Sequence, residues 1–169
     1  AFRCLMSDVP VAYDHIREQG KTGNMGARLM AIVAEGERGR IYLSPNAEQE
    51  EIARQAGPEW TPEMALPDNP RDFKTPNYGL TTYGDLFTAR QLVALTTFSD
   101  LVGEARERVK RDALVAGLPD DGKPLAQGGT GAQAYADAVA VYLAFAISKL
   151  ADRGSSICTW FTERDSTRK

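Results

Sequence analysis

Histidine and cysteine are scarce in this chain of 169 residues. His15 is the only histidine, and the two cysteines, Cys4 and Cys158, stand near opposite ends with no CxxC spacing. Structural zinc sites draw most of their ligands from these two residue types, and a Ser-His-Asp triad or a Cys-His pair needs a well-placed histidine. We therefore expect no metal site and no nucleophilic active site in the chain. So few cysteines fit a reducing compartment, which predicts a cytoplasmic location.

The chain also lacks an excess of positive charge and a long apolar run. It has 20 Lys and Arg against 23 Asp and Glu, a formal net charge of -3, so any contact with nucleic acid must be local. The longest uninterrupted apolar run, residues 138–147, has ten residues, whereas a helix needs about 18 to 20 to cross a bilayer. We expect no membrane partner and interpret this run as the interior of a buried helix.

The first third of the chain predicts a β-hairpin and a short helix. Residues 27–33 and 40–43 are apolar and β-permissive, and the Gly- and Glu-rich residues 35–39 between them favour a turn. Ser44 would then be the N-cap, with Pro45 at the first position of a helix that runs to about residue 56.

Proline is concentrated in the middle of the chain. Residues 58–76 contain five of the nine prolines, interspersed with Trp60 and Phe73 and followed by Tyr78 and Tyr83. Prolines of this density favour an extended chain, and the aromatic side chains can fasten it to a surface. Two interpretations stay open, a strap over the core and a loop that faces a ligand.

Two long helices are predicted in the second half. Thr88 with Gln91 forms one capping box, and Thr130 with Gln133 forms another. The second helix is apolar nearly all round, so we expect Phe145 to be a core residue. A strand should follow at residues 155–161, which are short, β-branched and aromatic.

These elements predict an α+β fold: an N-terminal β-hairpin and short helix over residues 1–57, a proline-rich connector over 58–86, and two long packed helices with a terminal strand over 87–169. We expect the three parts to form one compact fragment of a larger protein.

Gly20, Lys21 and Thr22 match the end of a phosphate-binding loop, which would point to a nucleotide-binding enzyme. That motif requires a glycine five positions before Gly20, where His15 stands, and a preceding strand. We predict instead that this glycine-rich stretch needs positive φ angles and approaches another backbone closely. The paired carboxylates Asp120 and Asp121 lie in a Gly/Pro-rich loop and are attributed to turn formation.

A local cluster of cations and an aromatic ring is the best candidate for contact with DNA. Such residues near a helix start can bind phosphates and stack on a base. Nearby acids, Asp68, Asp72 and Asp85, weaken the case. The candidate DNA-contacting residues are Arg71, Lys74, Asn77, Tyr78 and Arg90.

Residues 73–79 and 84–98 carry a resemblance to a known family, which extends to residues 26–33, 40–42 and 135–160. They resemble the central part of large bacterial adenine-specific DNA methylases that carry a zinc-ribbon segment and an N-terminal domain of unknown function. In that family the glycine-rich methyl-donor loop lies before this part and the Pro-Pro-Tyr catalytic motif lies after it. The resemblance therefore implies no catalytic residue and no cofactor-binding residue in this chain, with S-adenosylmethionine as cofactor of the parent enzyme only.

The resemblance implies a non-catalytic internal segment of a DNA (adenine) methyltransferase, inactive alone, that supports the catalytic fold or contacts DNA. Its partners would be the remaining domains of the parent enzyme and DNA. The family's zinc ribbon would end near Cys4, but Leu5, Met6 and Ser7 follow it where a second cysteine is expected, so no zinc ligand is carried over. The alternative is a structural or protein-interaction module without nucleic-acid contact, which the acidic composition favours.

Overall fold

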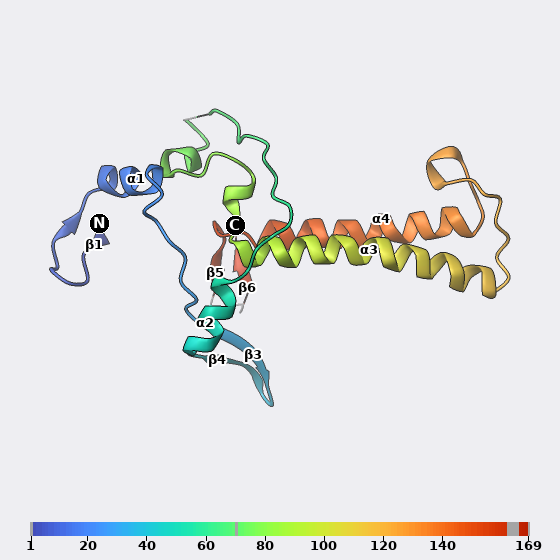
Figure 1. The fold of residues 1–169 in the computed structure, drawn as a ribbon, viewed down its shortest axis with the longest axis horizontal. Helices are drawn as coiled ribbons and strands as arrows, with labels where there is room; N and C mark the ends of the chain where they lie inside the picture. The colour runs from blue at the N-terminus through green and yellow to red at the C-terminus, as the bar shows by residue number, and fades with distance from the viewer. Residues whose placement is uncertain (1, 70, 162–165, 169) are drawn as a thin grey trace. The chain divides into compact units, whose positions relative to one another are not determined.

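The computed structural model describes residues 2–69, 71–161 and 166–168 (Figure 1). The fold class is α+β, as the sequence predicts, with small antiparallel sheets of two strands each and two long packed helices. The chain divides into two compact units, residues 1–90 and residues 91–169.

The first unit opens with a hairpin and a helix that the sequence did not predict. Strands β1 (Phe2–Arg3) and β2 (Pro10–Val11) pair antiparallel, and α1 (Tyr13–Lys21) follows directly. The Phe2 ring meets the Tyr13 ring edge-on, with 6.0 Å between centroids, which fastens the hairpin to the start of the helix. Elements of two residues are too short to leave a periodic signal in the sequence.

The predicted hairpin is present, with shifted bounds. Strand β3 (Ile32–Gly36) pairs with β4 (Gly39–Leu43) in a register that places Val33 opposite Tyr42. The first strand begins later and ends later than predicted, because the turn uses only two residues and the ladder continues to Gly36. Gly39 has a φ of 133°, which a residue with a side chain rarely adopts.

Helix α2 (Ala47–Arg54) is the short helix expected after this hairpin, but the predicted N-cap was wrong. Asn46, not Ser44, is the cap: its Oδ1 accepts the Gln49 N–H at 2.8 Å. The Gln49 side chain in turn accepts the Asn46 N–H at 3.0 Å, which completes a capping box. Ser44 lacks a partner of the Gln type three residues later, and Asn46 has one.

The proline-rich connector folds back on itself through backbone hydrogen bonds. Leu66 N donates to Thr81 O at 2.8 Å, and Ala65 pairs with Thr82 in an antiparallel bridge, which leaves the Leu66 side chain buried. The expectation that aromatic rings fasten this segment fails for Trp60, which is 63% exposed. Prolines cannot donate, so the pairing is made by the non-proline residues between them.

The second unit is built on a helical hairpin. Helices α3 (Ala89–Val115) and α4 (Ala132–Arg153) run side by side, joined by a loop that contains the short 3-10 helix η3 (Leu125–Gln127) (Figure 1). As predicted, α3 begins directly after Thr88 and ends before Gly117, whose φ is +91°.

The start of α4 differs from its prediction. Gly131 is the N-cap and makes no side-chain cap bond, so Thr130 and Gln133 do not form a capping box. The Thr130 N–H instead donates to Asp121 at 2.9 Å, and the Gln133 side chain is bonded to α3. The C-terminal strand, β5 (Thr159–Phe161), is present and pairs with β6 (Ser166–Arg168), a partner that the sequence did not indicate.

The buried side chains of the second unit form two separate groups, because α3 and α4 run in opposite directions and begin at opposite ends of the helix pair (Figure 1). Leu92 on α3 and Ala132, Ala134 and Ala136 on α4 are buried. The prediction that Phe145 is a core residue was wrong: its side chain is 63% exposed. A helix that is apolar all round presents more apolar surface than one neighbouring helix can cover, so part of it faces outward.

Within the described residues, α4 is also the one helix whose length and apolar composition would suffice to cross a membrane, with 11% of that stretch buried. The sequence run of ten residues did not indicate this, because polar residues flank it. The core helix of a soluble protein can have the same length and apolar composition.

Candidate functional site

A contact between two glycines organises the most distinctive site of the first unit. Gly20, in α1, faces the backbone of Tyr78 at the end of the short 3-10 helix η1 (Thr75–Tyr78). Gly79 faces the Gly20 carbonyl. A Cβ atom at either position would collide with the opposite backbone, and Gly79 has a φ of +87°. The predicted close approach to another backbone is present at Gly20. The positive φ expected of this stretch is found at Gly23 but not at Gly20 or Gly26, and Gly20 and Lys21 belong to α1 instead of a loop.

An open pocket of about 780 Å³ lies between α1 and η1. Its lining is rich in charged side chains and comes from the second half of α1, the residue after it, and the η1 region. The lining residues are Asp14, Arg17, Glu18, Lys21, Thr22, Lys74 and Asn77.

Some of these groups are already engaged. Arg17 donates to Asp14 at 3.0 Å, and its guanidinium lies over the Tyr78 ring, 5.7 Å from the centroid, in cation–π geometry. Thr22 Oγ1 donates to the Glu18 carbonyl at 2.9 Å and so satisfies one of the last carbonyls of α1. These contacts hold Arg17 and the end of α1 in place.

Other groups in the pocket are unengaged. In the part of the chain that the structure describes, the side chains of Lys21, Lys74, Asn77 and Glu18 make no hydrogen bond or ion pair. Lys21 and Lys74 are exposed to solvent. Two free ammonium groups from different elements therefore border one pocket, with one free carboxylate beside them.

The structure brings some of the sequence-predicted DNA contacts together and leaves others apart. Lys74 and Asn77 line the pocket, and Tyr78 forms the surface on which Arg17 rests. Arg71 lies outside the lining, is 91% exposed and makes a long ion pair of 3.8 Å with Asp72. Arg90 is an exposed residue of the first turn of α3 and does not line the pocket.

Asp85, one of the acids that weaken the predicted cluster, is committed to a local turn. Its Oδ2 accepts the N–H groups of Thr81 and Thr82, each at 2.8 Å. Burial raises the pKa of this carboxyl, but the bonds from Thr82 and Thr81 outweigh it and leave the pKa below its usual value. Asp85 thus holds the chain between the connector and α3.

Arg17 and Lys21 were missed at the sequence level, because no helix was predicted over residues 13–21. The usable signal was weak: Asp14 and Arg17 are spaced as an i,i+3 pair, and Lys21 stands where a basic residue suits a helix end. At the sequence level Lys21 and Thr22 belong to a glycine-rich stretch that was compared with a phosphate-binding loop. That motif is indeed not formed, since Gly20 is inside a helix.

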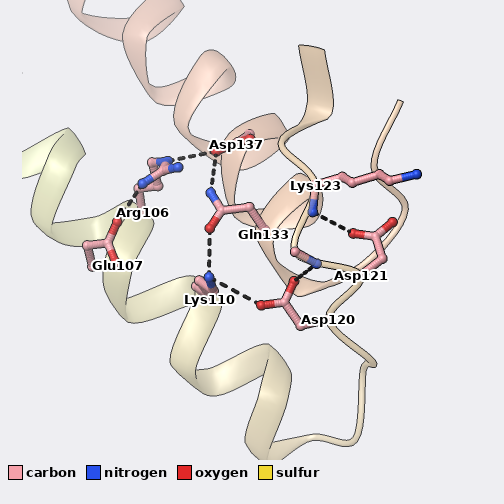
Figure 2. Close-up of polar contacts among 9 residues, drawn as sticks. Arg106, Glu107, Lys110, Asp120, Asp121, Lys123, Gln133 and Asp137 are labelled. Carbon is pink, nitrogen blue, oxygen red and sulfur yellow. Dashed lines mark hydrogen bonds and ion pairs between the residues drawn. The ribbon is translucent and has the colours of Figure 1, made fainter. Parts of the chain in front are cut away.

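A second polar cluster joins the two long helices of the second unit (Figure 2). Arg106 on α3 donates to Asp137 on α4 at 2.7 Å, and Lys110 donates to Gln133 at 2.7 Å. Gln133 also donates to Asp137 at 3.0 Å, so the two helix-to-helix contacts are linked. Lys110 pairs in addition with Asp120 at 3.2 Å.

The carboxylates of this cluster anchor the loop between the helices. Asp137 accepts the Leu125 N–H at 2.9 Å, and Asp121 accepts the Thr130 N–H at 2.9 Å. These backbone bonds are the first cause that lowers the pKa of each carboxyl, and Gly122 does the same for Asp120. The attribution of Asp120 and Asp121 to turn formation is confirmed. Because these groups are engaged with the loop, we interpret the cluster as structural.

No set of three or more His, Cys, Asp or Glu side chains that could hold a metal ion occurs among the described residues. No protein-family model, no curated protein and no solved structure matches the chain.

Proposed function

We propose that this chain is a non-catalytic segment of an S-adenosylmethionine-dependent, adenine-specific DNA methyltransferase, in which it supports the catalytic fold or contacts DNA. The link to this enzyme class rests on the resemblance of residues 73–79 and 84–98. In the structure these residues form η1, the 3-10 helix η2 (Gly84–Leu86) and the start of α3. The motifs that carry the resemblance therefore build the α1–η1 contact and the entry to the helical hairpin.

The exposed apolar face of α4 is the observation that carries the supporting role. Tyr135, Tyr142 and Phe145 are spaced so that they share one face of the helix, and all three are exposed, Tyr142 to 76%. Contiguous apolar surface of this kind marks contact with another protein surface more often than contact with water. Other domains of the same enzyme would cover it.

The role of the segment is separate from the chemistry of methyl transfer. The parent enzyme would bind S-adenosylmethionine and attack the methyl group with the amino group of an adenine flipped out of the duplex. In the family that the chain resembles, the groups for those steps belong to motifs before and after this part. The segment would support the catalytic domain that contains those groups.

A methyl-transfer assay on the complete protein encoded with this segment tests the proposal. We expect transfer of a labelled methyl group from S-adenosylmethionine to adenine in duplex DNA. The 169-residue chain alone should neither transfer methyl groups nor bind the donor in a calorimetric titration. A complete protein with no donor binding and no transfer would overturn the proposal, as would micromolar donor binding by the isolated chain.

The second candidate is a protein-interaction module without nucleic-acid contact. The same apolar face of α4 and the net charge of -3 favour it. Under this alternative the complete protein has no methyltransferase activity, so the same assay separates the two candidates.

A further inference from the structure

We propose that the pocket between α1 and η1 binds a phosphate group through Lys21 and Lys74. The choice of phosphate source rests on the proposed function: in a DNA methyltransferase it is a phosphodiester of the DNA backbone. The phosphate chemistry itself rests only on the pocket.

The charge balance of the pocket favours an anion. Asp14 is matched by Arg17 in an ion pair of 3.0 Å, which leaves Lys21 and Lys74 against Glu18. The pocket therefore keeps net positive charge in a chain that is negative overall. Lysine ammonium groups are regular partners of phosphate oxygens, and contacts of this kind position a protein on DNA without reading sequence.

The two lysines are brought together by a rigid contact. Lys21 ends α1 and Lys74 precedes η1, and these elements meet where Gly20 and Gly79 allow the backbones to touch. The Arg17 guanidinium, held by Asp14 and the Tyr78 ring, braces the same contact. Because the backbones are fixed, less freedom is lost when an anion binds between the lysines.

Polar donors and the shape of the pocket fit a phosphate on a polymer. The Asn77 amide is unengaged and adds N–H donors to the two ammonium groups. The volume of about 780 Å³ lies within the range of ligand sites, but the charged lining differs from the apolar walls that enclose small molecules. An exposed phosphodiester can enter such a pocket while the rest of the nucleic acid stays outside.

Glu18 supplies a prediction of opposite sign. Its carboxylate has no partner in the described structure and lines the same pocket, so it opposes an incoming anion. A site that binds phosphate by charge should bind it more tightly when Glu18 is neutral. Because charge interactions are screened beyond about 10 Å at 0.1 M salt, this tightening should be larger for Glu18 than for a carboxylate outside the pocket lining.

The experiment measures binding of a labelled DNA duplex to the 169-residue chain by fluorescence anisotropy, at about 50 and 200 mM salt. Lys21→Gln and Lys74→Gln should each weaken binding about fivefold at the lower salt. Each should also reduce the slope of log K against log salt concentration by about 0.9, the value for one phosphate contact. Glu18→Gln should tighten binding about two- to fivefold. Lys123→Gln removes the same charge from a lysine that points away from the helical-hairpin cluster in Figure 2, and Arg71→Gln removes one from outside the pocket lining. Both are matched controls and should weaken binding less than twofold.

Competition by inorganic phosphate separates the two phosphate sources. We expect DNA to bind and inorganic phosphate to displace it only weakly. If inorganic phosphate binds through the two lysines and DNA does not, the DNA assignment is overturned. Equal DNA binding by the native chain and by both lysine variants, with circular dichroism showing an intact fold, would overturn the pocket. The methyl-transfer assay is independent of this experiment. If the complete protein transfers no methyl group but the pocket variants bind DNA as expected, the enzyme assignment is wrong and the phosphate site remains.

Discussion

Single residues decide the α1–η1 contact. The glycine-rich stretch after residue 20 is visible in the sequence, and its need for unusual backbone geometry follows from glycine alone. The identity of the opposite backbone does not follow, because Tyr78 and Gly79 are distant in sequence and a contact between two backbones leaves no side-chain pattern. Lys21 therefore could not be connected with Lys74 before the structure was known.

Gly79→Ala should destabilise the first unit. The new Cβ would strain a residue with a φ of +87° and collide with the Gly20 carbonyl, so we expect a loss of about 2 kcal/mol or more in the free energy of unfolding. Gly103→Ala is the matched control: this helical glycine has open space around it, so alanine should stabilise α3 by about 0.5 to 1 kcal/mol. Urea unfolding of both variants checks this. A neutral Gly79→Ala would mean that the two backbones do not touch.

The helices show which features of an element are legible in the sequence. The extent of α3 was predicted closely, because a cap candidate, a periodic apolar face and a terminal glycine agree. The start of α4 was not, because Asp121 binds Thr130 and Lys110 binds Gln133 from other segments. Exposure of α4 also could not be predicted, since an apolar sequence does not say how much neighbouring structure covers it.

The position of the core can be tested with three alanine substitutions. Leu92 is 5% exposed, so Leu92→Ala should lower the free energy of unfolding by about 2 to 5 kcal/mol. Thr88→Ala should cost about 1 kcal/mol, because Thr88 stands at the cap position of α3. Phe145→Ala should cost less than about 1 kcal/mol, because the side chain is largely exposed. Chemical unfolding gives all three values, and a larger loss at Phe145 than at Leu92 would contradict this core.

The loop end of the helical hairpin should be sensitive to acid. The pKa values of Asp120, Asp121 and Asp137 are lowered in the folded chain, so their stabilising contribution is complete above the unfolded-state pKa of about 4. It is lost as the pH falls through the lower folded-state pKa values. We therefore expect the melting temperature, measured from the helical circular dichroism signal, to be lower at about pH 2 than at pH 5.

Asp137→Asn and Asp112→Asn form the matched pair for this acid response. Asp137→Asn removes the Arg106 ion pair, so it should lower the melting temperature at pH 7 and flatten the acid response. Asp112 makes only an exposed pair of 3.8 Å with Arg108, and its change to Asn should have little effect. Identical acid curves for the native chain and Asp137→Asn would contradict the role assigned to this carboxyl.

At the scale of the whole molecule, the predicted order of strands and helices gave the α+β class, and the net charge indicated that any nucleic-acid contact must be local. The net charge of -3 could not predict where on the chain such a contact lies, because it averages over cationic and anionic regions. The pocket is formed only where α1 meets η1, and two of its three cations, Arg17 and Lys21, come from a helix that the sequence did not indicate.

Tyr142→Glu tests the supporting role of the whole segment. In the isolated 169-residue chain Tyr142 is 76% exposed, so the substitution should change the free energy of unfolding by less than about 0.5 kcal/mol and reduce binding of a hydrophobic dye. In the complete protein the same glutamate would be buried without a partner when another domain covers α4, which costs several kcal/mol and lowers the melting temperature. Lys149→Glu, at an exposed polar position of the same helix, is the control and should leave both proteins unchanged within a degree or so. If Tyr142→Glu is as harmless in the complete protein as in the isolated chain, other domains do not cover this face, and the supporting role must be given up.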